Sequence, residues 1–127
     1  MFFYLLSIGT GGAVGALARY YAGRLIMERW GRVFPLGTFF VNITGSFLLC
    51  MISTWATRGG ILSPYLEVAL STGFLGAYTT FSTFAYEAIK LLEDREAFTA
   101  LTYVIGSILV GLGAGWLGLL AGFHLLF

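Results

Sequence analysis

Charged residues are scarce in this chain, and their scarcity excludes most kinds of soluble protein. Only 10% of the 127 residues are Asp, Glu, Lys or Arg, whereas 58% are hydrophobic. An average soluble domain carries about 25% charged residues. The few charges also cluster, so that long uncharged spans remain between them. The composition therefore predicts an integral membrane protein.

Three further scarcities narrow the range of functions. The formal net charge is only +1, so the basic footprint of a nucleic-acid-binding protein is missing. The single cysteine, Cys50, cannot form an intramolecular disulfide and is expected to pack as a small apolar residue. The single histidine, His124, has no carboxylate or thiol neighbour in sequence. With no catalytic set in sight, we expect that the protein is not an enzyme.

Four apolar segments reach the length of about 20 residues that a spanning helix needs. They are expected at about 2–26, 36–56, 65–91 and 97–126. The loops between them are short, so successive helices must be antiparallel neighbours. The sequence therefore predicts an all-α integral membrane protein of four transmembrane helices, with residues 1–127 forming one domain.

Glycines recur at four-residue spacing on the first and fourth segments: Gly11 with Gly15, Gly111 with Gly115, and Gly118 with Gly122. In an apolar helix this spacing lets two backbones approach closely. Two interpretations stay open, namely packing between helices of one chain and contact between subunits. Because four helices enclose little interior, a chain of this kind that moves a solute is expected to act as an oligomer.

The third segment contains a stretch, residues 73–84, that is unfavourable for a continuous helix. It holds two glycines, a Thr-Thr pair and a Ser-Thr pair inside the uncharged run 68–86. Non-helical backbone at membrane depth survives only where it is buried in protein or lines a wet cavity. A break would free main-chain carbonyls, which membrane proteins use to hold ions near the midplane. The sequence therefore predicts an ion site on a broken third helix.

Neutral polar groups gather on one face of the second segment. Thr38, Asn42 and Ser46 are four residues apart and so share a face. The Asn42 amide is either a link between helices, worth about 0.6 kcal/mol, or a donor that faces a pore. Tyr103 and Ser107 give the fourth segment a similar hydroxyl face. Such donors favour a small anion over a cation or an organic substrate.

Two rings on the third segment, Phe81 and Phe84, add a second means of facing an anion, because the edge of an aromatic ring is positive. Packing alone is the alternative interpretation of both rings. The carboxylates Glu67 and Glu87 are expected to flank the third span. A proton-coupled transporter usually has an acid deep in the bilayer, so this placement counts against proton coupling.

The chain resembles the Fluc (CrcB) fluoride channels in four pieces. Residues 73–84, GFLGAYTTFSTF, closely resemble the third-helix signature of that family. The other pieces agree in order and spacing: GGAVGALARY at 11–20, GTFFVNITGS at 37–46, and Gly106-Ser107. The resemblance covers essentially the whole chain. It implies a fluoride channel of the bacterial inner membrane, built as an antiparallel, dual-topology homodimer with two fluoride pores and a central structural sodium ion.

The resemblance also implies roles for single residues. The main-chain carbonyls of Gly76 and Thr79 would hold the sodium ion, which is structural and not transported. The rings of Phe81 and Phe84 would line the fluoride path. The same path would include the polar residues Asn42, Ser107, Thr38 and Tyr103, with Arg19 near the pore mouth. For Arg19, simple extension of the side chain to the membrane interface is the alternative.

The basic residues favour one orientation in the membrane. Five of them are expected on one side, and only Arg58 on the other: Arg24, Arg29, Arg32, Lys90 and Arg95. The positive-inside rule then places the first and third loops in the cytoplasm, whereas the resemblance implies both orientations.

The leading hypothesis is passive export of fluoride down its gradient. The alternative is a small four-helix multidrug or cation exporter, which would also be dimeric. A purely structural membrane subunit would leave the interrupted third helix unexplained.

Overall fold

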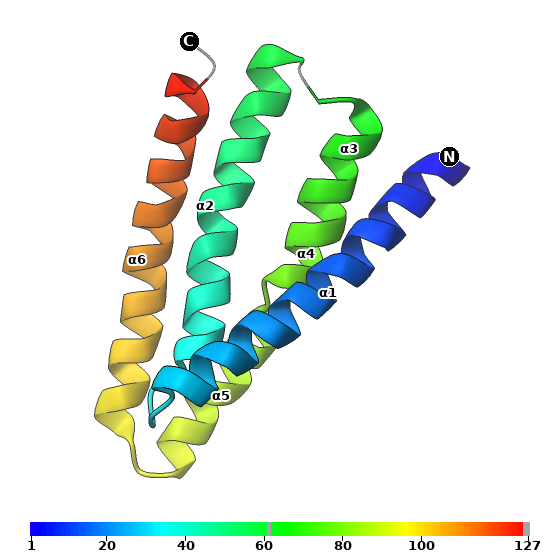
Figure 1. The fold of residues 1–127 in the computed structure, drawn as a ribbon. Coiled ribbons are helices and arrows are strands. Elements are labelled where there is room, and N and C mark those ends of the chain that lie inside the picture. Colours follow the sequence, from blue (N-terminus) through cyan, green and yellow to red (C-terminus); the bar gives the residue numbers. More distant parts are fainter. Residues whose placement is uncertain (61, 126–127) are drawn as a thin grey trace.

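Within residues 1–60 and 62–125, which the computed structural model describes, the chain forms helices and no strands (Figure 1). Three helices are long: α1 (Phe2–Trp30), α2 (Leu36–Gly59) and α6 (Ala97–His124). Four shorter elements lie between α2 and α6: α3 (Pro64–Val68), the π-helical turn η1 (Ala69–Leu75), α4 (Gly76–Tyr78) and α5 (Phe81–Glu93). In this part of the chain, α1, α2 and α6 have the length and hydropathy needed to cross a membrane.

The third predicted segment is interrupted where the sequence predicts a break. The elements α3, η1 and α4 follow one another directly, and α5 begins after two extended residues, Thr79 (φ −81°, ψ 157°) and Thr80 (φ −151°, ψ 115°). The longest piece, α5, has 13 residues and falls short of the roughly 20 that a span needs. The predicted break is therefore confirmed. The π-helical turn before it was not predicted.

Two helices extend further than the apolar segments predict. α1 continues to Trp30 and α2 to Gly59, so residues expected in loops are helical. In α1, the Arg24 Nε lies 2.6 Å from the Glu28 Oε1, and such pairs four residues apart stabilise a helix. The predicted ends fell short because hydropathy identifies only the apolar part of a helix and misses a charged last turn. The predicted end of the fourth segment, Leu126, lies outside the described residues.

The long helices run antiparallel to their neighbours in sequence (Figure 1). α2 and α6 pack side by side, and α1 crosses the broken third segment and packs against η1. The loops 31–35 and 94–96 lie at one end of the molecule, while the end of α2 and the start of α3 lie at the other. Arg32 and Arg95 are therefore at the end opposite Arg58, as the sequence predicts.

The glycines of α1 bring its backbone against the third segment. A Cβ on Gly11 would collide with the carbonyl of Ala69, and a Cβ on Gly15 would collide with that of Phe74. Both obstacles are main-chain atoms, which cannot turn away as a side chain can. Of the two open interpretations, packing within the chain accounts for this pair.

The glycines of α6 bring it against α2 in the same way. A Cβ on Gly118 would collide with the Phe47 carbonyl, and one on Gly122 would lie 2.7 Å from the Thr54 Cβ. Gly115 faces the half-buried Cys50, whose Sγ would be 3.3 Å from a Cβ. Cys50 therefore lies between α2 and α6 but is half-buried, whereas the sequence predicts a buried thiol.

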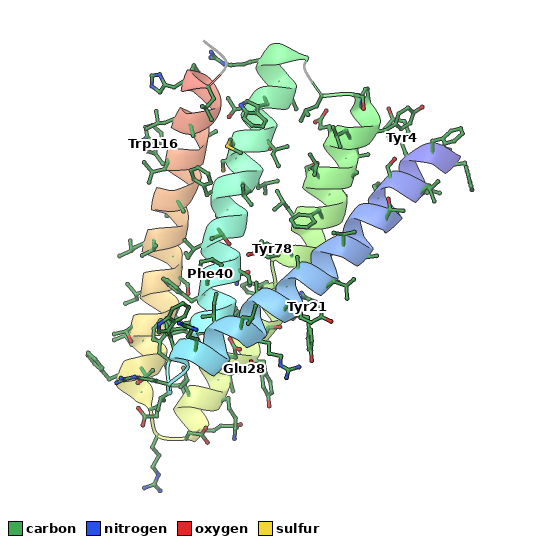
Figure 2. All side chains as sticks on the ribbon, in the orientation of Figure 1. Tyr4, Tyr21, Glu28, Phe40, Tyr78 and Trp116 are labelled. Atoms are coloured by element: carbon green, nitrogen blue, oxygen red, sulfur yellow. The ribbon has the colours of Figure 1, made fainter. Side chains whose placement is uncertain are left out.

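A cluster of buried and half-buried residues around Tyr103 fixes the start of α6 relative to α5. Tyr103 is completely buried, and its ring centroid lies 5.4 Å from that of Phe34 and 5.2 Å from that of Phe84. Leu91 and Ala100 complete the buried part of this cluster. A second cluster joins α2 to the third segment through Val41, Ile52, Leu75 and Tyr78, of which Tyr78 is labelled in Figure 2. The two clusters hold α5 and α4 on either side of the break.

We expect Gly15→Ala to lower the free energy of unfolding by about 1–3 kcal/mol, because the added methyl forces α1 away from the Phe74 carbonyl. Gly9 is the matched control on the same helix, since nothing lies within 4 Å of a Cβ there. Unfolding midpoints of both variants in detergent micelles measure the difference. Equal midpoints would show that α1 does not pack on η1 through Gly15.

Candidate ion site at the helix break

The side chain of Asn42 takes the place of a main-chain partner at the break. Its Oδ1 accepts a hydrogen bond from the Thr80 N–H at 2.8 Å, and its Nδ2 donates to the Thr80 carbonyl at 3.0 Å. One side chain therefore binds both main-chain polar groups of one extended residue, Thr80, which belong to two successive peptide units. An amide nitrogen has two N–H donors, so one of them remains for a ligand. The interhelical link that the sequence left open is present, and the pore role of Asn42 stays a prediction.

Thr80 begins α5 with its own side chain. Its Oγ1 accepts a hydrogen bond from the Thr83 N–H at 3.2 Å, which is the usual arrangement at a helix N-cap. The same hydroxyl lies 3.0 Å from the Thr83 Oγ1 and 3.3 Å from the Ser82 Oγ. The helix can therefore restart directly after the two extended residues.

These two contacts release two specific carbonyls. In an unbroken helix the N–H of Thr80 would donate to Gly76, and the N–H of Thr83 to Thr79. Both N–H groups donate to side chains instead. Gly76 is exposed and Thr79 is half-buried, so the released carbonyls lie at the surface of the chain. They are the two carbonyls that the resemblance assigns to sodium.

The chemistry of the break suits a hard cation. Such cations prefer oxygen ligands, main-chain carbonyls included. In the described part of the chain, no three His, Cys, Asp or Glu side chains gather into a metal-binding group. A cation held here would therefore depend on main-chain oxygens, and the released carbonyls of Gly76 and Thr79 fit that requirement.

Arg19 reaches the break from α1. Its Nη1 lies 3.5 Å from the Thr79 carbonyl oxygen, at the outer limit of a hydrogen bond. The side chain is half-buried. The structure therefore places the Arg19 guanidinium beside the break, and its role near a pore mouth stays a prediction.

A cavity of about 260 Å³, which we call the break groove, opens beside the break. It brings together residues of α2, the break and α5: Asn42, Gly45, Ser46, Leu49, Thr79, Thr80, Phe81 and Phe84. The ring centroids of Phe81 and Phe84 are 5.9 Å apart. Phe81 is 79% exposed, so its ring is open to a ligand or a partner. Three of the predicted fluoride-path residues thus share one groove.

A second cavity of about 640 Å³, the α2–α6 groove, continues from the first. The two grooves share Ser46 and Leu49 in their walls. Ser107 lines the second groove, and its buried hydroxyl has no hydrogen-bond partner among the described residues. A buried hydroxyl normally finds a partner. Ser107 therefore leaves a donor available along the line that begins at the break.

Thr38 and Tyr103 do not line either groove, because both bind Glu87. The Thr38 Oγ1 donates to one carboxylate oxygen of Glu87 at 2.9 Å, and the Tyr103 hydroxyl donates to the other at 2.7 Å. Glu87 is half-buried. The sequence predicted that Glu87 would flank the span, and its partnership with these hydroxyls was missed. The available signal was its position three residues after Phe84, which places it near that face of α5.

A family model described as "CrcB-like protein, Camphor Resistance (CrcB)" matches residues 6–119. The chain belongs to the CrcB family. The resemblance seen in the sequence is therefore confirmed over nearly the whole chain. With its apolar helices, this CrcB-family chain is a multi-pass membrane protein, and the curated relatives are bacterial.

Three curated relatives of this CrcB-family chain are each named fluoride-specific ion channel FluC. The protein from Geotalea daltonii is 48% identical over 117 residues, which are 92% of this chain and 94% of the relative. The protein from Geobacter metallireducens is 43% identical over 121 residues, or 95% of this chain and 98% of the relative. The protein from Rhizobium meliloti is 41% identical over 123 residues, or 97% and 95%. The alignments thus cover almost the full length of both partners.

Gly45 lets α2 approach the break in this CrcB-family chain. Substitutions at Gly45 and at Thr79 therefore test how closely α2 packs there. A Cβ on Gly45 would collide with the Cγ2 of Thr79. We expect Gly45→Ala to destabilise the protein and Thr79→Ser to be mild, since the Thr79 hydroxyl that bonds to the Leu75 carbonyl is kept. The double variant removes the obstacle and should recover stability, with a coupling energy of about 1 kcal/mol or more.

Unfolding of the unchanged protein, the two single variants and the double variant in detergent gives this coupling energy. Additive effects of the two substitutions would contradict the close approach of α2 to Thr79. The cycle needs no assumption about function.

Proposed function

We propose that this CrcB-family chain is a fluoride-selective channel, not an enzyme, that exports fluoride passively and so lowers its cytoplasmic concentration. The observation that carries the proposal is the break groove, where a spare amide donor of Asn42 lies with two aromatic rings beside a broken helix. The names of the relatives agree with it, since they are called fluoride-specific ion channels. The alternative exporter has no such support.

The groove offers fluoride what a small, strongly hydrated anion requires. Donors must replace the water that the ion loses on entry. Asn42 and Ser107 supply neutral donors along the line of the two grooves. The edges of the rings of Phe81 and Phe84 add weak positive potential without tight binding. Selectivity over chloride would follow from the width of the path and from the small number of donors.

Thr38 and Tyr103 belong to the proposed route in a different way. Their hydroxyls hold Glu87, so fluoride can accept from them only when the carboxylate gives them up. An ionised Glu87 would also repel the anion. Arg19, beside the break, supplies a positive charge that draws an anion toward the break groove.

We infer that two chains form an antiparallel, dual-topology homodimer, with four membrane crossings in each chain. The support is that a single chain leaves groups at the break uncovered. Phe81 is largely exposed, Gly76 is exposed, and both grooves are open. In a bilayer, released carbonyls facing lipid would cost several kcal/mol each. A second copy that covers the break removes this cost and closes the wall of each path.

The carbonyls of Gly76 and Thr79 from both chains are proposed to hold a structural sodium ion. The support is their release from helical hydrogen bonding, described above. Several carbonyl oxygens that point toward one another carry partial negative charge, and a bound cation offsets it. It is not transported, and by mass action it stabilises the assembled state.

Purified protein in liposomes is expected to pass fluoride far faster than chloride, because the donors along the grooves are few and neutral. An ion-selective electrode measures each anion as it leaves loaded vesicles, and empty vesicles serve as the control. Equal fluxes of the two anions would exclude the proposed selectivity. Proton-coupled movement of an organic cation would support the exporter instead.

Phe81→Ile and Phe84→Ile are each expected to reduce fluoride flux sharply while the dimer stays assembled. Isoleucine keeps apolar bulk but removes the positive ring edge. Phe98→Ile is the matched control, since Phe98 is 80% exposed on α6 outside both grooves. Size-exclusion chromatography checks assembly. Normal flux in assembled Phe81 and Phe84 variants would reduce the two rings to packing residues.

A further inference from the structure

We propose that Asn42 and Thr80 are positioning residues that keep the carbonyls of Gly76 and Thr79 available for the sodium ion. Asn42 frees the Gly76 carbonyl, and Thr80 frees the Thr79 carbonyl. This inference rests on the sodium site proposed above. It assigns the availability of that site to side chains that do not themselves touch the ion.

The first step of the argument is the competition for two N–H groups. Asn42 Oδ1 holds the Thr80 N–H at 2.8 Å, and Thr80 Oγ1 holds the Thr83 N–H at 3.2 Å. Helical register would pair these same N–H groups with Gly76 and Thr79. Without the side-chain acceptors, each N–H would need a new acceptor in a medium that offers no water. In helical register, the nearest acceptor for each N–H is the carbonyl that is proposed to bind the sodium ion.

The second step of the argument is that Asn42 forms hydrogen bonds with both the N–H and the carbonyl of Thr80. It accepts from the Thr80 N–H and donates to the Thr80 carbonyl, so it fixes the direction of that extended residue. Asn42 comes from α2, whereas the Thr80 hydroxyl acts within the third segment. The two carbonyls are therefore released by two independent contacts, and each can be removed separately.

Arg19 does not cancel this release. Its Nη1 lies 3.5 Å from the Thr79 oxygen, which makes a weak contact. A carbonyl oxygen has two lone pairs, so one remains for a cation. The Gly76 carbonyl is not part of this contact.

The test compares variants that keep or remove each acceptor. Thr80→Val keeps the shape and removes Oγ1, whereas Thr80→Ser keeps a hydroxyl. Asn42→Leu keeps the size and removes Oδ1, whereas Asn42→Asp keeps an acceptor for the Thr80 N–H. Thr57→Val is the matched control for loss of a threonine hydroxyl, because Thr57 is exposed on α2 and bonds only to main-chain carbonyls of its own helix.

The readout is the thermal unfolding midpoint of the purified protein in detergent as sodium chloride replaces choline chloride at constant ionic strength. A ligand that binds only the folded state raises the midpoint as its concentration increases. Thr80→Val and Asn42→Leu should each displace the curve of midpoint against the logarithm of sodium concentration to roughly tenfold higher sodium, since a recaptured carbonyl must first give up a hydrogen bond. Thr80→Ser, Asn42→Asp and Thr57→Val should need no more sodium than the unchanged protein.

The outcomes separate the two proposals. A merely structural role of Asn42 and Thr80 would lower the midpoint at every sodium concentration and leave the sodium dependence unchanged, which would overturn this inference alone. Absence of sodium dependence in the unchanged protein would overturn the sodium site and this inference together. If one of the two acceptor-free variants does not fold, the other decides the result by comparison with its acceptor-keeping partner.

Discussion

The exchange of hydrogen bonds between Asn42 and Thr80 is the contact on which the rest of the structure depends. An extended residue in the bilayer can leave its N–H without a helical partner, at a cost of several kcal/mol. The Asn42 amide accepts from the Thr80 N–H at 2.8 Å and also donates to the Thr80 carbonyl at 3.0 Å. Because this one side chain makes the break tolerable, the third segment can change direction inside the membrane. The groove, the exposed ring of Phe81 and the released carbonyls all follow from that change.

Small residues surround the break because three stretches of backbone meet there. Gly11 and Gly15 let α1 pack on the main chain of η1, and Gly45 lets α2 reach Thr79. Larger side chains would hold these backbones apart and put the Asn42 amide out of reach of Thr80. The glycines therefore support the break indirectly, by setting how closely the helices approach.

The charged and neutral groups of the site occupy different places. Neutral donors and aromatic rings line the two grooves, while the carboxylate of Glu87 is held apart by Thr38 and Tyr103. An anion that entered the grooves, as proposed, would therefore meet few fixed negative charges. Phe84 lines a groove and Glu87 does not, although they are only three residues apart in sequence. Helix packing therefore decides which of the two side chains faces the groove.

The sequence by itself determined the membrane setting, the apolar segments, the family and the place of the break. These depend on local quantities: hydropathy over about 20 residues, and glycine and hydroxyl residues in a span. It also named Asn42, Phe81 and Phe84 as fluoride-path residues; the structure brings the three to one groove, and their role in the path stays a prediction. Only the tertiary structure decided their partners. The pairing of Asn42 with Thr80, of Arg19 with Thr79, and of Thr38 and Tyr103 with Glu87 joins residues up to 60 positions apart. Such contacts depend on how helices cross and rotate, which no periodicity along one helix specifies.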